Sequence, residues 1–99
     1  MDTEMENEWF AVKKGVKFRL TYASNPILGY DWFILGNYDG VLQLLNSHYT
    51  PLSANGMGGG EKTFIFSCLK EGETEFQLIY KKPWDQFAKR QVVCRVEVI

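Results

Sequence analysis

Alternation between apolar and polar residues is the feature that most limits how this chain can fold. The alternation repeats in short segments separated by Gly, Asn and Asp turns, which is typical of strands that bury one face. Because no segment has a convincing helical period, the sequence predicts an all-β fold, a β-sandwich of about seven antiparallel strands. The expected strands are residues 9–12, 16–22, 30–35, 41–45, 63–69, 74–80 and 91–98.

The length and composition fit a single domain. With 99 residues, of which 45% are hydrophobic and 15% aromatic, the chain can build one core without a metal or a disulfide. We expect residues 1–7 to form a flexible N-terminal tail and residues 8–99 to form the domain.

The charge balance limits the partners of the chain. A formal net charge of −1 argues against nucleic acid and against an anionic membrane, since both require a basic surface. No apolar run is long enough to cross a bilayer, and we expect a monomer. The acidic start, Met1 to Glu6, lacks the regions of a signal peptide. This favours a cytoplasmic location, whereas a signal removed ahead of Met1 would direct the protein to vesicles, to lysosomes or out of the cell.

The two cysteines, Cys68 and Cys94, do not indicate a metal site. They have no CxxC spacing and no nearby histidine, so we expect no metal and no cofactor. Cys94 shares the inward side of its segment with Val92 and Val96, so it should be buried and inert. We favour two free thiols in a reducing compartment, and a single disulfide is the alternative.

Residues 25–30, called the first loop here, contain an unusual turn. Pro26 restricts φ, and Gly29 permits a backbone conformation that other residues resist. Between them lie two large apolar residues, Ile27 and Leu28. Two interpretations remain open: these side chains form a surface that meets a partner, or one of them packs back into the core.

Three unusual loops should lie at the same end of the sandwich. Successive turns of an antiparallel sandwich alternate between its ends, so the first loop should lie beside residues 55–60 (the glycine loop) and residues 82–87 (the Lys-Pro-Trp loop). Glycines let a backbone approach a partner closely. Met57 is a flexible apolar side chain, and Trp84 is of the residue type most common as an interface anchor. Alternatively, Trp84 only covers the core and the glycines form a plain linker.

Together these loops resemble the chagasin family of cysteine protease inhibitors. The motifs stand in the family's order with similar strand spacing, from about Trp9 to Val98. They are Asn25-Pro26-x-x-Gly29-Tyr30-x-Trp32, Gly56-Met57-Gly58-Gly59 and Lys82-Pro83-Trp84. The resemblance implies an immunoglobulin-like β-sandwich. It also implies reversible, non-covalent inhibition of papain-like (cathepsin-type) cysteine proteases, either endogenous or of a host.

The resemblance also assigns a role to each loop. Together they would form a wedge in the substrate cleft, with the first loop covering the catalytic Cys–His pair. The glycine loop would line one side through its main chain, and the Lys-Pro-Trp loop would pack on the other. Leu28 and Trp84 are the implied anchors, with Trp32 as core support. The implied protease-binding residues are Asn25, Pro26, Ile27, Leu28, Gly29, Tyr30, Gly56, Met57, Gly58, Gly59, Lys82, Pro83 and Trp84.

The chain departs from the family's pattern at two places. Ile27 and Leu28 replace the usual threonine pair, whose hydroxyl can hydrogen-bond near the catalytic histidine. Losing that bond would cost about 1–3 kcal/mol, and burying Leu28 would return about 1.5–3 kcal/mol. Lys82 replaces the usual arginine, which keeps the charge and loses the planar, bidentate geometry.

Two other classes of function remain to be weighed. A cysteine hydrolase needs a thiol beside a histidine, but the only histidine is His48 and Cys94 should face the core, so we do not expect an enzyme. The second is an immunoglobulin-like adhesion or carbohydrate-binding domain with a non-protease partner. It accounts for the sandwich and leaves the three loops unexplained.

Overall fold

The computed structural model describes residues 3–54 and 58–99. It contains seven strands and one short 3₁₀ helix. The strands are β1 (Glu4–Val12), β2 (Lys17–Ser24), β3 (Asp31–Leu35), β4 (Leu42–Pro51), β5 (Gly60–Cys68), β6 (Gly72–Lys81) and β7 (Arg90–Val98), and the helix η1 is Pro26–Leu28.

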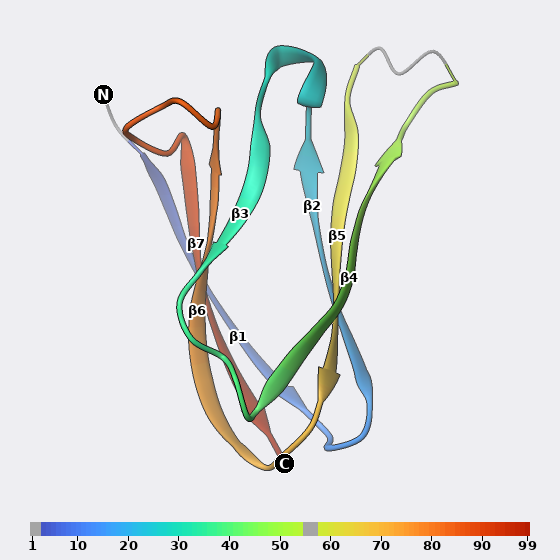
Figure 1. Cartoon of the computed structure of the whole chain (residues 1–99), viewed down its shortest axis with the longest axis vertical. Helices are drawn as coiled ribbons and strands as arrows, with labels where there is room; N and C mark the ends of the chain where they lie inside the picture. Colours follow the sequence, from blue (N-terminus) through green and yellow to red (C-terminus); the bar gives the residue numbers. More distant parts are fainter. Residues whose placement is uncertain (1–2, 55–57) are drawn as a thin grey trace.

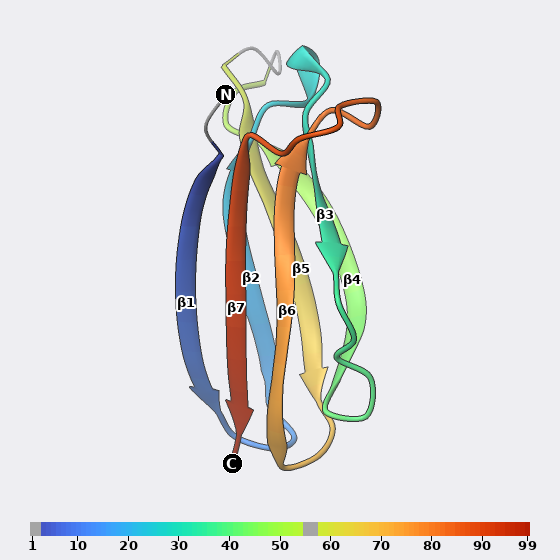
Figure 2. The same cartoon turned by 90° about the vertical axis from the view of Figure 1, so that its left-hand side faces the viewer.

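The strands form two sheets that pack face to face (Figures 1 and 2). One sheet has the order β1-β7-β6-β3 and the other the order β2-β5-β4. The predicted all-β sandwich is therefore confirmed. One detail was wrong: β1 pairs with β7 in parallel, so the strands are not all antiparallel.

The inward sides of the strands make one core. Phe66, Leu78, Val92, Cys94 and Val96 have no exposed surface, as expected for alternate residues on the inner face of each sheet. Edge-to-face and tilted ring contacts link the two sheets, for example between Phe66 and Phe76, whose centroids are 5.3 Å apart. Both cysteines are free and buried, as expected.

The predicted flexible tail is wrong for the part of it that the structure describes. The first strand begins at Glu4 and runs beside β7, and Thr3 Oγ1 donates a hydrogen bond to the Ala88 carbonyl. The guanidinium of Arg90 pairs with Glu6 and lies 3.6 Å from Glu4. Carboxylates that look like a solvated tail in the sequence are thus held by a cation that is distant in the chain.

The strand expected at residues 41–45 is longer than predicted. It runs as β4 to Pro51, and the register with β5 shifts between Leu44 and Asn46, which leaves Leu45 unpaired as a β-bulge. His48 therefore lies within an edge strand, and its side chain is exposed. Within the described residues, no helix is long and apolar enough to span a membrane. The same residues contain no group of three acidic, His or Cys side chains suited to a metal ion.

Candidate functional site

The three loops singled out in the sequence lie at one end of the sandwich, which we call the loop pole. They connect β2 to β3, β4 to β5 and β6 to β7, and all three are at the top of Figures 1 and 2. The other connections lie at the opposite pole. The argument from alternating turns therefore placed the loops correctly.

The first loop is a single turn of 3₁₀ helix rather than an extended turn. Pro26 opens it, and hydrogen bonds join Leu28 N to the Asn25 carbonyl (3.2 Å) and Gly29 N to the Pro26 carbonyl (2.9 Å). Gly29 ends it with a φ of 90°, a left-handed conformation that favours glycine. The side chains of Ile27 and Leu28 are 62% and 59% exposed, so the interpretation that one of them packs into the core is wrong.

Aromatic side chains beneath the first loop hold it in place. The backbone N–H of Asn25 donates to the Tyr80 hydroxyl at 2.9 Å, and the rings of Tyr30 and Tyr80 stack with centroids 5.0 Å apart. Trp32 is buried, and its Nε1 donates to the Ala23 carbonyl at 3.0 Å. These contacts fit the expected role of Trp32 as core support.

Glycines bring the three loops into contact with one another. A Cβ at Gly59 would lie 2.9 Å from the Ser24 carbonyl oxygen, so the glycine loop packs closely on the end of β2. A Cβ at Gly29 would lie 3.5 Å from the Trp84 ring and 3.7 Å from Cγ of Lys82. The first loop is therefore the central member, with one loop against each side.

The Lys-Pro-Trp loop has a compact turn at its base and aromatic side chains outside. Asp85 N donates to the Lys82 carbonyl at 3.0 Å, and the Lys81 ammonium donates to the Asp85 carbonyl at 2.9 Å. Trp84 is 74% exposed, so it does not cover the core. Phe87 is 70% exposed on the same loop. The sequence analysis placed Phe87 in this loop but not among the binding residues.

The glycine loop is described only in part. Gly56 and Met57 lie outside the described residues. Gly58 is exposed with a φ of 90°, and Gly59 is buried, with its carbonyl accepting a hydrogen bond from Leu52 N at 3.1 Å. Leu52 is exposed at the base of this loop and was not predicted as a site residue. An apolar residue placed directly after Pro51, at the end of a strand, was the signal that pointed to it.

The cysteines do not form a catalytic pair with the histidine. His48 is exposed on β4, whereas Cys68 and Cys94 are buried. Burial raises the pKa of the Cys94 thiol to about 11, and burial also raises the pKa of the Cys68 thiol, so neither thiolate forms near neutral pH. The Tyr22 hydroxyl donates to Glu8 at 2.8 Å beside Cys94, and burial raises the pKa of Tyr22 as well.

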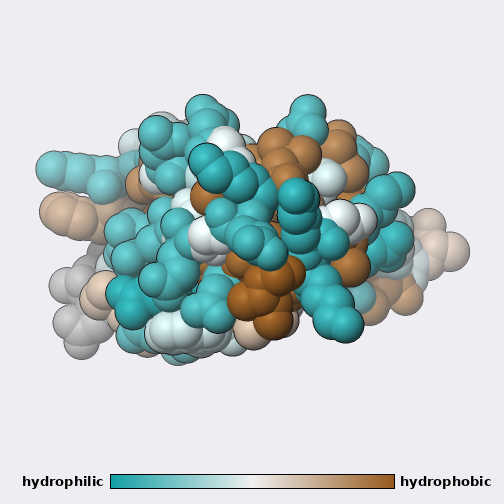
Figure 3. All heavy atoms as spheres, turned by 90° about the horizontal axis from the view of Figure 1, so that it is seen from below, coloured by the Kyte–Doolittle hydropathy of each residue, from teal (hydrophilic) through white to brown (hydrophobic). Residues whose placement is uncertain are grey.

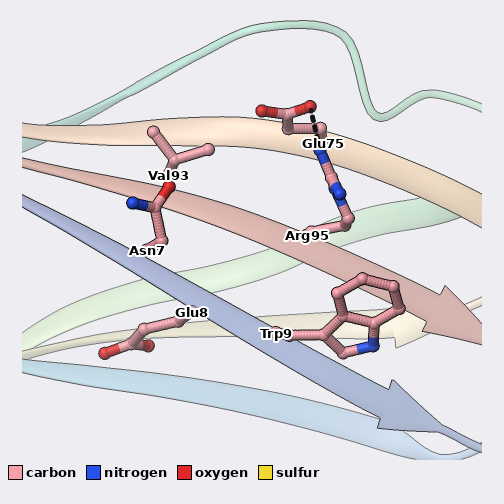
Figure 4. Close-up of a pocket in the computed structure, with 6 residues that line it drawn as sticks. All are labelled: Asn7, Glu8, Trp9, Glu75, Val93 and Arg95. Atoms are coloured by element: carbon pink, nitrogen blue, oxygen red, sulfur yellow. Dashed lines mark hydrogen bonds and ion pairs between the residues drawn. The ribbon is translucent and has the colours of Figure 1, made fainter.

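The largest hollow on the described surface lies away from the loops. It is open, measures about 290 Å³, and is lined by residues of β1, β6 and β7 on the outer face of the four-stranded sheet (Figure 4). Arg95 lies over the exposed Trp9 ring at 5.6 Å and pairs with Glu75 at 3.5 Å. The polar groups of this hollow thus pair with one another on an open surface, and it does not adjoin the three loops.

Comparisons with known proteins give a consistent result. Residues 11–98 match the sequence profile described as chagasin family peptidase inhibitor I42. No curated protein sequence matches the chain.

Solved structures match over nearly the whole chain. The crystal structure of the cysteine protease inhibitor EhICP2 from Entamoeba histolytica has a TM-score of 0.79 and 20% identity, over 98% of this chain and 96% of that one. PbICP-C in complex with falcipain-2 has a TM-score of 0.70 and 18% identity, over 98% and 91%. Leishmania mexicana ICP has a TM-score of 0.68 and 22% identity, over 100% and 91%. At these identities the structures establish that the fold is shared.

Proposed function

Because this chain belongs to the chagasin family of peptidase inhibitors, we propose that it reversibly and non-covalently inhibits papain-like cysteine proteases. The loop pole is the part that enters the substrate cleft and covers the catalytic Cys–His pair. The protein itself carries out no catalysis. The inhibitors that share its fold include a cysteine protease inhibitor of Entamoeba histolytica and one solved in complex with falcipain-2.

The observation that carries this proposal is the apolar surface of three touching loops. Ile27 and Leu28 from the first loop and Trp84 from the Lys-Pro-Trp loop are mostly exposed, although each is large and apolar. Trp84 and the first loop meet at Gly29, so these side chains form one ridge rather than scattered residues. An exposed ridge of this kind on a rigid scaffold is suited to insertion into a cleft.

The shape of the first loop explains how it would resist cleavage. Hydrolysis needs a peptide carbonyl held in line with the attacking thiolate. The 3₁₀ turn of residues 26–28 and the left-handed Gly29 keep this backbone compact. The contacts of Asn25 and Tyr30 with Tyr80 hold the turn before binding, so little conformational entropy is lost on association.

The departures from the family's pattern bear on affinity rather than on the mode of binding. Leu28 contributes apolar burial of about 1.5–3 kcal/mol in place of a hydroxyl hydrogen bond of similar size. Lys82 keeps one positive charge on the flank of the ridge without the bidentate geometry of arginine.

A titration of an active-site-quantified papain-like protease tests the proposal. We expect the hydrolysis of a fluorogenic peptide to stop near one-to-one stoichiometry. Activity should return on dilution, with the inhibitor intact by mass spectrometry. Absence of inhibition at micromolar excess against several such proteases would contradict the proposal and favour the alternative of an immunoglobulin-like binding domain with a non-protease partner.

A further inference from the structure

Two lysines from opposite ends of one connection converge on a single aromatic ring. The ammonium groups of Lys82 and Lys89 lie 5.3 and 5.2 Å from the centroid of the Tyr30 ring. Tyr80 stacks on one face of that ring, which leaves the other face to the two ammonium groups. No other ring in residues 3–54 and 58–99 has two lysines over it. Cation–π attraction thus holds two like charges near each other.

These two ammonium groups have no counter-ion among the carboxylates of the described part of the chain. Arg90 pairs with glutamates of β1, Arg95 pairs with Glu75, and Lys62 lies 3.5 Å from Asp31. No such pair within 4 Å is formed by Lys82 or Lys89. The acidic side chains of β1 nearest to this connection are already engaged by Arg90. The lysine pair therefore remains available to an anionic group from outside.

The lysine pair lies on the flank of the apolar ridge. Cγ of Lys82 is 3.7 Å from the position that a Cβ on Gly29 would take, and Trp84, which packs on the same glycine, follows two residues later. A protease that accepts the ridge in its cleft would therefore place the rim of that cleft beside the two ammonium groups. A carboxylate is the protein side chain that would complement them.

We propose that Lys82 and Lys89 form a specificity-determining pair that binds an Asp or Glu side chain on the rim of the target protease's cleft. The protein accordingly prefers papain-like proteases with an acidic rim. This inference rests on the proposed function and names the class of target within it. Complementary charge at a rim acts mainly by accelerating association, and salt screens that effect.

The test compares two double variants with the same change in net charge. Lys82→Gln/Lys89→Gln removes the pair. Lys13→Gln/Lys14→Gln removes two adjacent lysines from a turn at the opposite pole. Association and dissociation rates are measured with an acidic-rim protease and with a neutral-rim protease, at low and high salt. Thermal unfolding checks that each variant is folded.

We expect the first variant to slow association with the acidic-rim protease about three- to tenfold at low salt. This loss should shrink at high salt, and Lys82→Arg/Lys89→Arg should restore the rate. The Lys13/Lys14 variant should associate like the wild type, and neither variant should discriminate with the neutral-rim protease.

The outcomes separate this inference from the proposed function. If the wild type inhibits and the Lys82/Lys89 variant associates with the acidic-rim protease at the wild-type rate, the pair has no such role, while the proposed function stands. Equal losses from both double variants would also overturn the inference, because they would reflect net charge alone. If the wild type inhibits neither protease, the proposed function fails and the role of the pair fails with it.

Discussion

The two poles of this sandwich are built from the same strands but use their backbone groups differently. At the opposite pole, main-chain hydrogen bonds join separate turns. Gly15 N donates to the Cys68 carbonyl and Leu69 N to the Val41 carbonyl, both at 2.9 Å. Seen from below, this pole is mostly hydrophilic, with apolar residues in small separate groups (Figure 3). Its polar groups therefore satisfy one another or face water.

At the loop pole the turns are joined by packing. The first loop forms its hydrogen bonds within its own 3₁₀ turn, and it meets its neighbours through glycine contacts with Trp84 and Ser24. This arrangement leaves Ile27, Leu28 and Trp84 outside. The comparison indicates that the capacity to bind lies where apolar side chains, rather than backbone groups, are left without partners inside the fold.

Trp84→Ala should break the comparison most strongly. Loss of an exposed aromatic anchor is expected to cost about 2–4 kcal/mol of binding, roughly a 30- to 1,000-fold rise in the inhibition constant. Because Trp84 contributes little to the core, the melting temperature should change little. The matched control is Trp9→Ala, which removes another exposed tryptophan from the outer sheet face and should leave inhibition unchanged. Equal effects of the two variants would contradict the assignment of binding to the loop pole.

Leu28→Ala should have the next largest effect. We expect a loss of about 1.5–2.5 kcal/mol of binding, since most of the apolar surface of Leu28 is free to be buried by a protease. The inhibition constant is the readout, and guanidinium unfolding should report unchanged stability. Val16→Ala, which trims an exposed aliphatic residue at the opposite pole, serves as the control. An unchanged inhibition constant for Leu28→Ala would remove the first loop from the interface.

Gly59→Ala should separate close packing from backbone strain. Gly59 has a φ of 84°, and its new Cβ would crowd the Ser24 carbonyl at 2.9 Å. We expect a loss of about 1–2 kcal/mol in stability, with roughly a three- to tenfold weaker inhibition as the glycine loop shifts.

The control for Gly59 is Gly15→Ala at the opposite pole. Gly15 has a similar φ of 87°, and nothing lies within 4 Å of its Cβ position. It should therefore lose about 1 kcal/mol of stability from strain alone and inhibit as the wild type does. If both variants inhibit equally well, the contact between the glycine loop and β2 has no role in shaping the loop pole.

Alkaline pH should weaken the core between the poles by the smallest amount. Burial raises the pKa of the Cys94 thiol from its ordinary value of about 9 to about 11, so the folded state holds a proton that the unfolded chain releases first. The stabilisation is complete below pH 9 and is lost as the pH rises toward 11, with about 1 kcal/mol lost by pH 10.

Guanidinium midpoints at pH 8 and pH 10 measure this effect. Tyr22, whose pKa is also raised by burial, adds a loss of the same sign at higher pH. Cys94→Ala should lower stability at both pH values through the cavity it leaves, and should show a smaller difference between them. The same pH dependence in the variant would mean that another group is responsible.

Much of the fold and of the candidate site could be predicted because the informative patterns are local. Alternation over six to eight residues marked the strands, and counting turns was enough to gather the three loops at one pole. Pro26 and Gly29 similarly marked the first loop as constrained, although its 3₁₀ turn was not foreseen.

The features that were missed depend on partners distant in the sequence. Glu4 and Glu6 resemble a solvated tail until Arg90, more than eighty residues later, is placed beside them. The parallel pairing of β1 with β7 has no local pattern either. The convergence of Lys82 and Lys89 on Tyr30 also requires the fold, because sequence spacing does not show that both ends of a loop lean over one ring.

The parallel pairing of β1 with β7 decides how the protein can be handled. Because both strands run away from the loop pole, the chain enters beside the loops, with Thr3 bonded to Ala88, and leaves at the far end, where Ile99 N donates to the Val12 carbonyl. A surface anchor or fluorophore joined after Ile99 would keep the loops free for a protease. The same group joined ahead of Thr3 would crowd them, so immobilisation should use the C-terminal side.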